Sequence, residues 1–178
     1  SEENPDPLKQ KLDAYDAALK KRASHIPLQQ IIGQQEFMGL SFFVNEHVLI
    51  PRQDTEILVE EVLKELHDGM RVLDMCTGSG CILLSLLHYS NDCEGLGVDL
   101  SAEALEVAGR NVLKVLTPEK AEHAHFLQSD LFEKVEGKFE IIVSNPPYIA
   151  SAEVEKLMPE VRDHEPRMAL DGTEDGLY

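Results

Sequence analysis

The fold is decided by residues 71 to 88, which read RVLDMCTGSGCILLSLLH. Residues 71 to 74 predict a strand, residues 76 to 80 a glycine-rich turn, and residues 82 to 88 an apolar helix. The glycines of the turn allow the tight bend and the close backbone approach that a nucleotide-like ligand needs at a helix N-terminus. This stretch therefore predicts a ligand site at the end of a buried strand.

The same alternation of strand and helix continues along the chain. Residues 95 to 99 predict a second strand, Ser101 caps the helix that follows, and residues 125 to 130 predict a third strand. The fourth strand ends at Asn145, and its β-branched run at residues 141 to 143 predicts a strand buried on both faces. Such alternation predicts parallel strands joined by right-handed crossovers, so the expected fold class is α/β and Rossmann-like.

Two smaller units are expected before this domain. Residues 1 to 33 form a helical segment, in which an amphipathic helix runs from Pro7 to about Ala23 and needs a packing partner. Residues 34 to 50 predict a β-hairpin linker, which is either a wall of the substrate site or a plain packing hairpin. The α/β domain then takes residues 51 to 178, and it is expected to lack its C-terminal strands because the fourth strand leaves the sheet without an obvious last edge.

Composition and charge limit the classes of protein to consider. The formal net charge of −17 argues against direct binding of nucleic acid and favours a basic protein as partner. The three cysteines lack Cys-x-x-Cys spacing and the seven histidines lack ligand spacing, so we expect no metal site and a reducing compartment. No stretch approaches the ~18 apolar residues of a membrane span. We therefore expect a cytoplasmic protein that does not bind membranes.

Carboxylates at three strand ends indicate which ligand the turn binds. Asp74 could take an ammonium group directly or through water, Asp99 could accept from ribose hydroxyls, and Asp130 could accept from an adenine amino group. Leu83 stands where a dinucleotide fingerprint has its third glycine, and no Gly-Lys-Ser/Thr sequence follows the turn. A single strand-end Asp is more often a cap, but the ordered set of three favours a cationic adenosyl ligand without phosphates. S-adenosylmethionine is such a ligand.

The sequence Asn145-Pro146-Pro147-Tyr148 predicts a clamp for a planar amino group. The Asn145 side-chain oxygen and the Pro146 carbonyl can accept both hydrogens of an NH2 group, and the Tyr148 ring can lie against its flat face. The nitrogen's third direction is then open to an electrophile. The alternative is a strand that ends in a Pro-Pro turn with a packed tyrosine.

In this order, these residues resemble a class I S-adenosylmethionine-dependent methyltransferase, and further segments narrow the resemblance to the HemK family. The segments that carry it are Gln35 to Gly39, Ile50 to Glu56, Leu73 to Gly80, Asn145 to Tyr148 and Glu165 to Gly172. Enzymes of that family methylate the N5 amide nitrogen of glutamine in the Gly-Gly-Gln motif of peptide chain release factors. The resemblance runs from about Leu28 to Tyr178, and family members are longer at both ends.

The resemblance implies a role for each matching residue. It implies that the cofactor is held by Cys76, Thr77, Gly78, Ser79 and Gly80, by Asp99 at the ribose, by Asp130 and Leu131 at adenine, and by Asn145. It also implies that Asn145, Pro146, Pro147 and Tyr148 hold the substrate glutamine. Two residues depart from the family pattern: Gln53 stands where proline is common and Cys76 where glycine is common.

Two other functions remain open at this point. Adenine also presents a planar NH2 group, so an adenine-N6 methyltransferase acting on DNA or RNA would need a similar clamp and would have to flip the base into it. The acidic balance of the chain counts against that function. The other alternative is a chain that binds the cofactor without catalysing a reaction.

Overall fold

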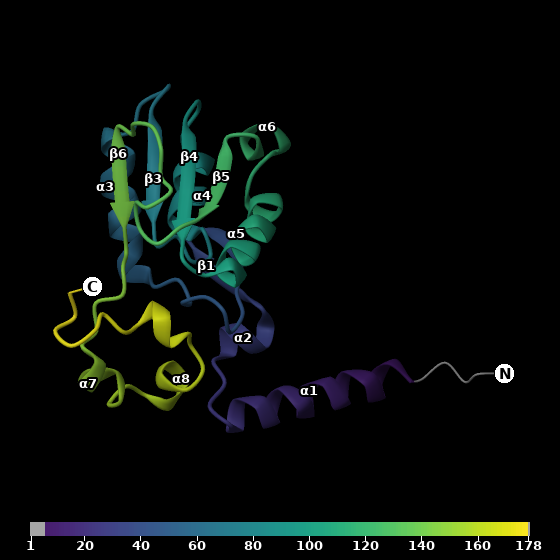
Figure 1. Cartoon of the computed structure of the whole chain (residues 1–178). Helices are drawn as coiled ribbons and strands as arrows, with labels where there is room; N and C mark the ends of the chain where they lie inside the picture. Colours follow the sequence, from purple (N-terminus) through teal and green to yellow (C-terminus); the bar gives the residue numbers. More distant parts are fainter. Residues whose placement is uncertain (1–5, 178) are drawn as a thin grey trace.

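The computed structural model describes residues 6–177 and has a four-stranded parallel sheet as its centre (Figure 1). The sheet order is β5-β4-β3-β6, which confirms the predicted parallel α/β arrangement. Its strands are β3 (Arg71–Met75), β4 (Glu94–Asp99), β5 (Ala124–Gln128) and β6 (Ile141–Ser144). The main helices are α3 (Glu56–Glu65), α4 (Cys81–Tyr89) and α5 (Ala102–Val115), and a short α6 (Pro118–Ala121) precedes β5.

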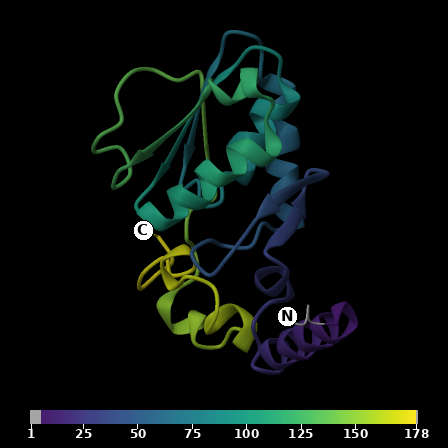
Figure 2. The same ribbon diagram turned by 90° about the vertical axis from the view of Figure 1, so that its right-hand side faces the viewer.

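The helices α3, α4 and α5 lie on one face of the sheet, as Figure 2 shows with the sheet seen edge-on. The predicted Ser101 cap is confirmed, because its hydroxyl accepts the backbone N–H of Ala104 at 3.0 Å. The core beneath these helices includes Val72 from β3, Leu83 from α4 and Val112 from α5. The opposite face carries a smaller cluster that is covered by the loop between β5 and β6.

The strand β6 lies at the edge of the described sheet. It pairs with β3 alone among the described residues, and the Ile142 side chain is therefore 57% exposed while Val143 is buried. The prediction that residues 141 to 143 are buried on both faces is wrong for the described structure. A β-branched run fits a half-buried edge strand as well as a central strand, and the sequence does not separate the two.

The hairpin is shorter than residues 34 to 50. It consists of β1 (Gln34–Phe37) and β2 (Leu40–Phe43), and Phe37 and Phe42 pack edge-to-face inside the core. Residues 44–55, here called the connector, carry no strand and include the 3-10 helix η1 (Gln53–Thr55). The hairpin itself therefore packs against the domain, while the connector continues toward the ligand site. The domain boundaries proposed at residues 33 and 50 stay predictions.

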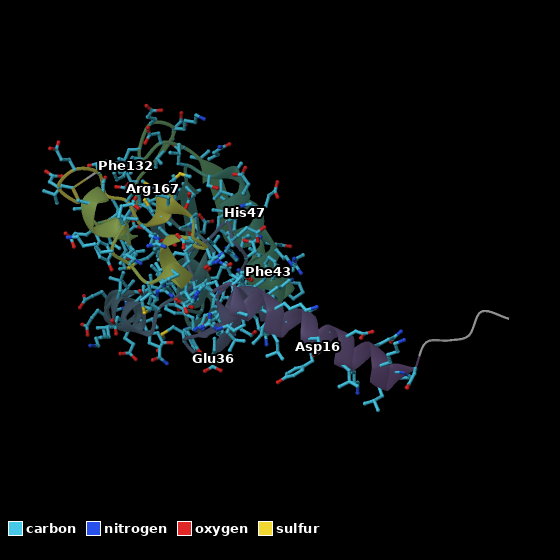
Figure 3. All side chains as sticks on the ribbon, turned by 90° about the horizontal axis from the view of Figure 1, so that it is seen from below. Asp16, Glu36, Phe43, His47, Phe132 and Arg167 are labelled. Atoms are coloured by element: carbon cyan, nitrogen blue, oxygen red, sulfur yellow. The ribbon has the colours of Figure 1, made fainter. Side chains whose placement is uncertain are left out.

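The helix α1 (Pro7–Ala23) has the predicted bounds and extends away from the rest of the molecule (Figure 3). It has no buried residue, and its apolar side chains at Leu8, Leu12, Tyr15 and Leu19 are about half exposed or more. Its C-terminal end is anchored through Arg22, whose guanidinium donates to Glu160 at 2.9 Å. The short helix α2 (Leu28–Ile32) follows and leads into the hairpin.

The chain after β6 is irregular and passes beneath the carboxyl ends of the strands (Figure 1). It contains α7 (Ser151–Val154), α8 (Pro159–Arg162) and the 3-10 helix η2 (Arg167–Ala169). No helix within residues 6–177 is both long and apolar enough to span a bilayer.

Candidate active site

A cavity of about 600 Å³ lies at the carboxyl ends of the parallel strands. Ligands bind at this edge in open α/β sheets. Three segments form most of its walls: the glycine-rich turn after β3, the connector, and residues 166–174, here called the tail wall. The ends of β4, β5 and β6 contribute Asp99, Asp130 and Asn145. The structure thus brings most of the predicted cofactor and substrate residues to one cavity, whereas Asp74, Gly80, Pro146 and Tyr148 do not line it.

The glycine-rich turn is built from left-handed backbone conformations. Cys76, Gly78 and Gly80 have φ values of 61°, 54° and 77°. A Cβ at Gly80 would in addition lie 3.2 Å from Leu84 and 3.3 Å from Ala108, so the close packing of α4 and α5 also favours glycine there. Cys76 adopts this conformation without being glycine, which is unfavourable for a residue with a Cβ.

Asp74 lies beneath the turn and does not line the cavity. Its carboxylate accepts the Thr77 hydroxyl at 2.6 Å and the Leu83 N–H at 3.3 Å, while its Oδ1 atom has no partner among the described residues. Burial, with a smaller contribution from the nearby Asp99, raises the pKa of Asp74 to about 7. The predicted contact with a ligand ammonium, directly or through water, stays a prediction. Asp74 shapes the turn from below.

Asp99 faces the cavity from the end of β4. Its two oxygens accept the N–H of Gly78 at 2.8 Å and the N–H of Ser101 at 3.0 Å, which fixes the carboxylate between the turn and α5. Each carboxylate oxygen can accept a further hydrogen bond. Asp99 can therefore receive a pair of ligand hydroxyls without losing its own contacts.

Asp130 and Leu131 line the cavity beyond the end of β5. The strand ends at Gln128, two residues before the predicted end, so both residues belong to a loop. Leu131 has a φ of 44° and is 37% exposed, which leaves an apolar side chain at the cavity rim. A flat apolar ligand group such as a base would cover it.

Asn145 enters the cavity because β6 is in register with β3. Ser144 pairs with Met75, and the Ser144 hydroxyl donates to the Met75 carbonyl at 2.7 Å, so the next residues of the two strands, Asn145 and Cys76, emerge side by side. The Asn145 side chain takes part in no hydrogen bond within the described part of the chain, although it is partly buried. Its amide is available to a ligand next to the glycine-rich turn.

The remaining clamp residues lie less deeply. Pro147 lines the cavity, whereas Pro146 and Tyr148 do not, and the Tyr148 side chain is 68% exposed. The predicted position of the Tyr148 ring against an amide in the cavity is therefore not present in this structure. Tyr148 lies at the surface, where a side chain that enters from outside could meet it.

The tail wall and residues 51–55 of the connector were not assigned to the site from the sequence, whereas residues 44–50 belong to the segment predicted to be either a wall of the substrate site or a packing hairpin. The tail wall is held to the clamp by backbone hydrogen bonds from Ile149 N–H to the Leu170 carbonyl and from Gly172 N–H to the Ile149 carbonyl. A side chain at Gly172 would lie 2.9 Å from backbone atoms of Pro147 and Tyr148. Periodicity says nothing about such irregular segments. Their only signal was the resemblance of residues 50 to 56 and 165 to 172 to family segments.

Asn111 was also missed. It is fully buried on α5, and its NH2 group donates to the carbonyls of Phe43 and Ser79 while its oxygen accepts the Phe43 N–H. It thereby joins the hairpin to the glycine-rich turn. A polar residue on the apolar face of a predicted helix was the signal that could have identified it.

The two cysteines of the cavity are neutral thiols. Burial raises the pKa of Cys76 to about 11 and that of Cys81 to about 12. Neither is suited to act as a nucleophile at neutral pH. The described residues contain no group of three or more His, Cys, Asp or Glu side chains arranged to hold a metal ion.

Comparison with known proteins identifies a family and several relatives of the chain. Residues 52–162 match the family described as Methyltransferase small domain. A relative from Clostridium acetobutylicum named release factor glutamine methyltransferase is 47% identical over 170 residues, which cover 93% of this chain and 59% of the relative. A relative from Leptospira interrogans with the same name is 45% identical over 163 residues, covering 89% of this chain and 56% of the relative. The chain spans little more than half the length of these relatives.

The fold has a counterpart among solved structures. The crystal structure of Trm5b from Pyrococcus abyssi superposes with a TM-score of 0.53 at 18% identity, covering 65% of this chain and 33% of that protein. At this identity the likeness concerns the fold alone. Together with the family match, it confirms the predicted Rossmann-like methyltransferase fold.

Proposed function

Because the chain belongs to the methyltransferase small domain family, we propose that it methylates the N5 amide nitrogen of the glutamine in the Gly-Gly-Gln motif of peptide chain release factors. The methyl donor in this proposal is S-adenosylmethionine. The observation that carries the proposal is the position of Asn145, whose free amide lies beside the glycine-rich turn in one cavity. The curated relatives named release factor glutamine methyltransferase support the choice of substrate.

The cavity fits the proposed cofactor. The left-handed turn brings backbone close to the ligand space, and Asp99 keeps free acceptor capacity for two ribose hydroxyls. Asp130 and Leu131 would contact the adenine amino group and ring. The turn residues Cys76 to Gly80 include no cationic side chain, which suits a ligand without phosphates. When bound, S-adenosylmethionine supplies an electrophilic methyl group on a sulfonium centre.

Asn145 and Pro146 would then orient the acceptor nitrogen. An amide nitrogen is a weak nucleophile because its lone pair is delocalised into the carbonyl group. The Asn145 side-chain oxygen and the Pro146 carbonyl would accept its two hydrogens and direct the lone pair into the cavity. The N–CH3 bond would form as the S–CH3 bond breaks and S-adenosylhomocysteine leaves, and the methylated nitrogen, now strongly acidic, would then release one proton to water. The acceleration comes from orientation and from dipoles that are already in place, so no strong base is needed before transfer. Tyr148 would move or rotate onto the amide face as the substrate enters, since it is exposed without substrate.

The proposal is tested by mass spectrometry of the product. The chain is incubated with S-adenosylmethionine and a purified release factor, and the tryptic peptide that contains Gly-Gly-Gln is analysed for one added methyl group on glutamine. A parallel reaction contains duplex DNA. We expect methylation of the glutamine and none of adenine. Methylated adenine would contradict the proposal in favour of a nucleic-acid substrate, and cofactor binding without any product would contradict catalysis by this chain. The cytoplasmic location expected from the sequence stays a prediction.

A further inference from the structure

Glu165 is a buried carboxylate outside the cavity that joins two of its walls. Its side chain is 1% exposed. One oxygen accepts the backbone N–H of Ile50 at 3.0 Å, and the other accepts the guanidinium of Arg52. Hydrogen bonds to a carboxylate are among the stronger ones in proteins. Glu165 therefore ties the connector firmly to the segment that begins the tail wall.

These contacts are the sole hydrogen bonds between the connector and residues 145–177 in the part of the chain that the structure describes. Both linked segments line the cavity. The connector contributes Leu49, Pro51 and Arg52 to one wall. The residues directly after Glu165 contribute to another. A single side chain thus sets the separation of two walls that are otherwise joined only by packing.

The tail wall transmits this position to the clamp. The Ser151 hydroxyl donates to Asp171 at 2.6 Å, and the Gly172 N–H donates to the Ile149 carbonyl at 2.8 Å. The backbone at Gly172 passes so close to Pro147 and Tyr148 that an added Cβ would lie 2.9 Å from their backbone atoms. A shift of the tail wall would therefore shift the loop that carries Asn145.

We propose that Glu165 is a positioning residue that fixes the distance between the connector and the clamp, and thereby the width of the ligand cavity. It touches neither ligand and acts through Ile50, Arg52 and the tail wall. The inference rests on the proposed function in one respect, which is that the cavity binds S-adenosylmethionine and a substrate amide. Because Glu165 is buried with a cation, replacing it with a neutral residue leaves the Arg52 contact weakened. Glutamine keeps one acceptor, but its NH2 group would oppose the Ile50 N–H or the Arg52 guanidinium.

The test compares E165Q, E165D and the control E160Q in the full chain. Glu160 also accepts from an arginine, Arg22, but this pair anchors α1 and lies outside the cavity lining. Calorimetry with S-adenosylhomocysteine measures ligand affinity, and amide hydrogen exchange measures local opening. Both measurements are independent of the methyl acceptor. A failure to methylate a release factor would therefore not be confused with a failure of this inference.

We expect E165Q to weaken S-adenosylhomocysteine binding about tenfold and E160Q by less than about twofold, since a small misplacement of binding groups has a large effect. The amides of Ile50 and Gly172 should exchange faster in E165Q, while those of β3 and β4 stay protected. E165D keeps the charge on a shorter side chain and should recover part of the affinity. In a cycle that includes the single variant R52Q, the loss in the double variant R52Q/E165Q should stay within about twofold of E165Q alone, because both changes break one link.

Three results would overturn the inference. The first is wild-type affinity together with unchanged exchange at Gly172 in E165Q. The second is faster exchange throughout the sheet, which would mean that Glu165 supports the whole fold rather than the spacing of two walls. The third is additive losses in the double variant, which would mean that Arg52 and Glu165 act separately.

Discussion

The two sides of the cavity are built differently. On the side of the glycine-rich turn, Thr77 and Ser79 are 4% and 2% exposed, and the turn follows a strand with neighbours on both edges. On the side of the clamp, Pro146 and Tyr148 are exposed and follow an edge strand. The turn residues are thus buried without any ligand, whereas the clamp residues Pro146 and Tyr148 are open to solvent and would be covered by a bound substrate. Under the proposed function, cofactor binding would depend on the fold and acceptor specificity would depend on what docks at the open side.

Removing the Asn145 amide should lower the rate of methyl transfer, which depends on the clamp side, far more than cofactor affinity, which depends on the turn side. We expect Asn145→Ala to lower the rate of methyl transfer by ~10²-fold, as the loss of one preorganised polar group does in other enzymes. S-adenosylhomocysteine affinity should fall by a much smaller factor, because Asn145 makes no hydrogen bond that supports the described fold and Asp99 and the turn stay in place. Single-turnover kinetics and calorimetry measure the two quantities. The control is Asn91→Ala at an exposed position. A near-wild-type transfer rate would remove Asn145 from the chemistry.

Removing the Asn111 side chain, which supports the glycine-rich turn, should affect the turn side of the cavity. Asn111→Leu leaves three backbone groups of Phe43 and Ser79 without their partner, and we expect a loss of about 2 kcal/mol in the free energy of unfolding. Urea denaturation measures this loss. S-adenosylhomocysteine binding should weaken as well, since Ser79 belongs to the cavity lining. Unchanged stability would show that the hairpin and the turn do not depend on Asn111.

A methyl group at Gly172 should disturb the clamp side alone. The added Cβ would meet backbone atoms at 2.9 Å, which cannot move aside as a flexible side chain can. We expect Gly172→Ala to lower methyl transfer about tenfold with little change in cofactor affinity, because a displaced loop misaligns the acceptor. The matched substitution is Gly109→Ala, where nothing lies within 4 Å of the added atom. Equal rates for both variants would refute the close contact.

The buried carboxylate under the turn should give an effect that appears as a dependence of stability on pH. The pKa of Asp74 is raised from 3.8 to about 7 in the folded chain, so its contribution to stability is complete below about pH 4 and is lost as the pH rises through about 7. The free energy of unfolding should fall relative to that of Asp74→Asn by at most about 1.4 kcal/mol per pH unit in this range. Urea denaturation at several pH values measures it. Parallel pH profiles of the two proteins would contradict the raised pKa.

Much of the sheet and the cofactor side could be predicted from the sequence because each depends on local signals. The glycines of the turn, the Ser101 cap and the apolar runs of β3 and α4 each determine their own structure. The contacts of Glu165 could not be predicted, because they join residues more than a hundred positions apart. The exposure of Ile142 depends on which strand lies beside β6, and that is a property of the whole sheet. The burial of Asp74 has the same origin, since helix and sheet close over a residue that looks accessible at a strand end.

The most direct test is a crystal structure of the chain with S-adenosylhomocysteine and a glutamine-containing peptide from a release factor. The account predicts that the glutamine Nε2 atom lies about 3 Å from the Asn145 side-chain oxygen and from the Pro146 carbonyl, with the ligand sulfur beside it over the glycine-rich turn. Asp99 should accept the ribose hydroxyls in the same structure. A glutamine side chain bound elsewhere, or an Asn145 amide turned away from it, would contradict the account.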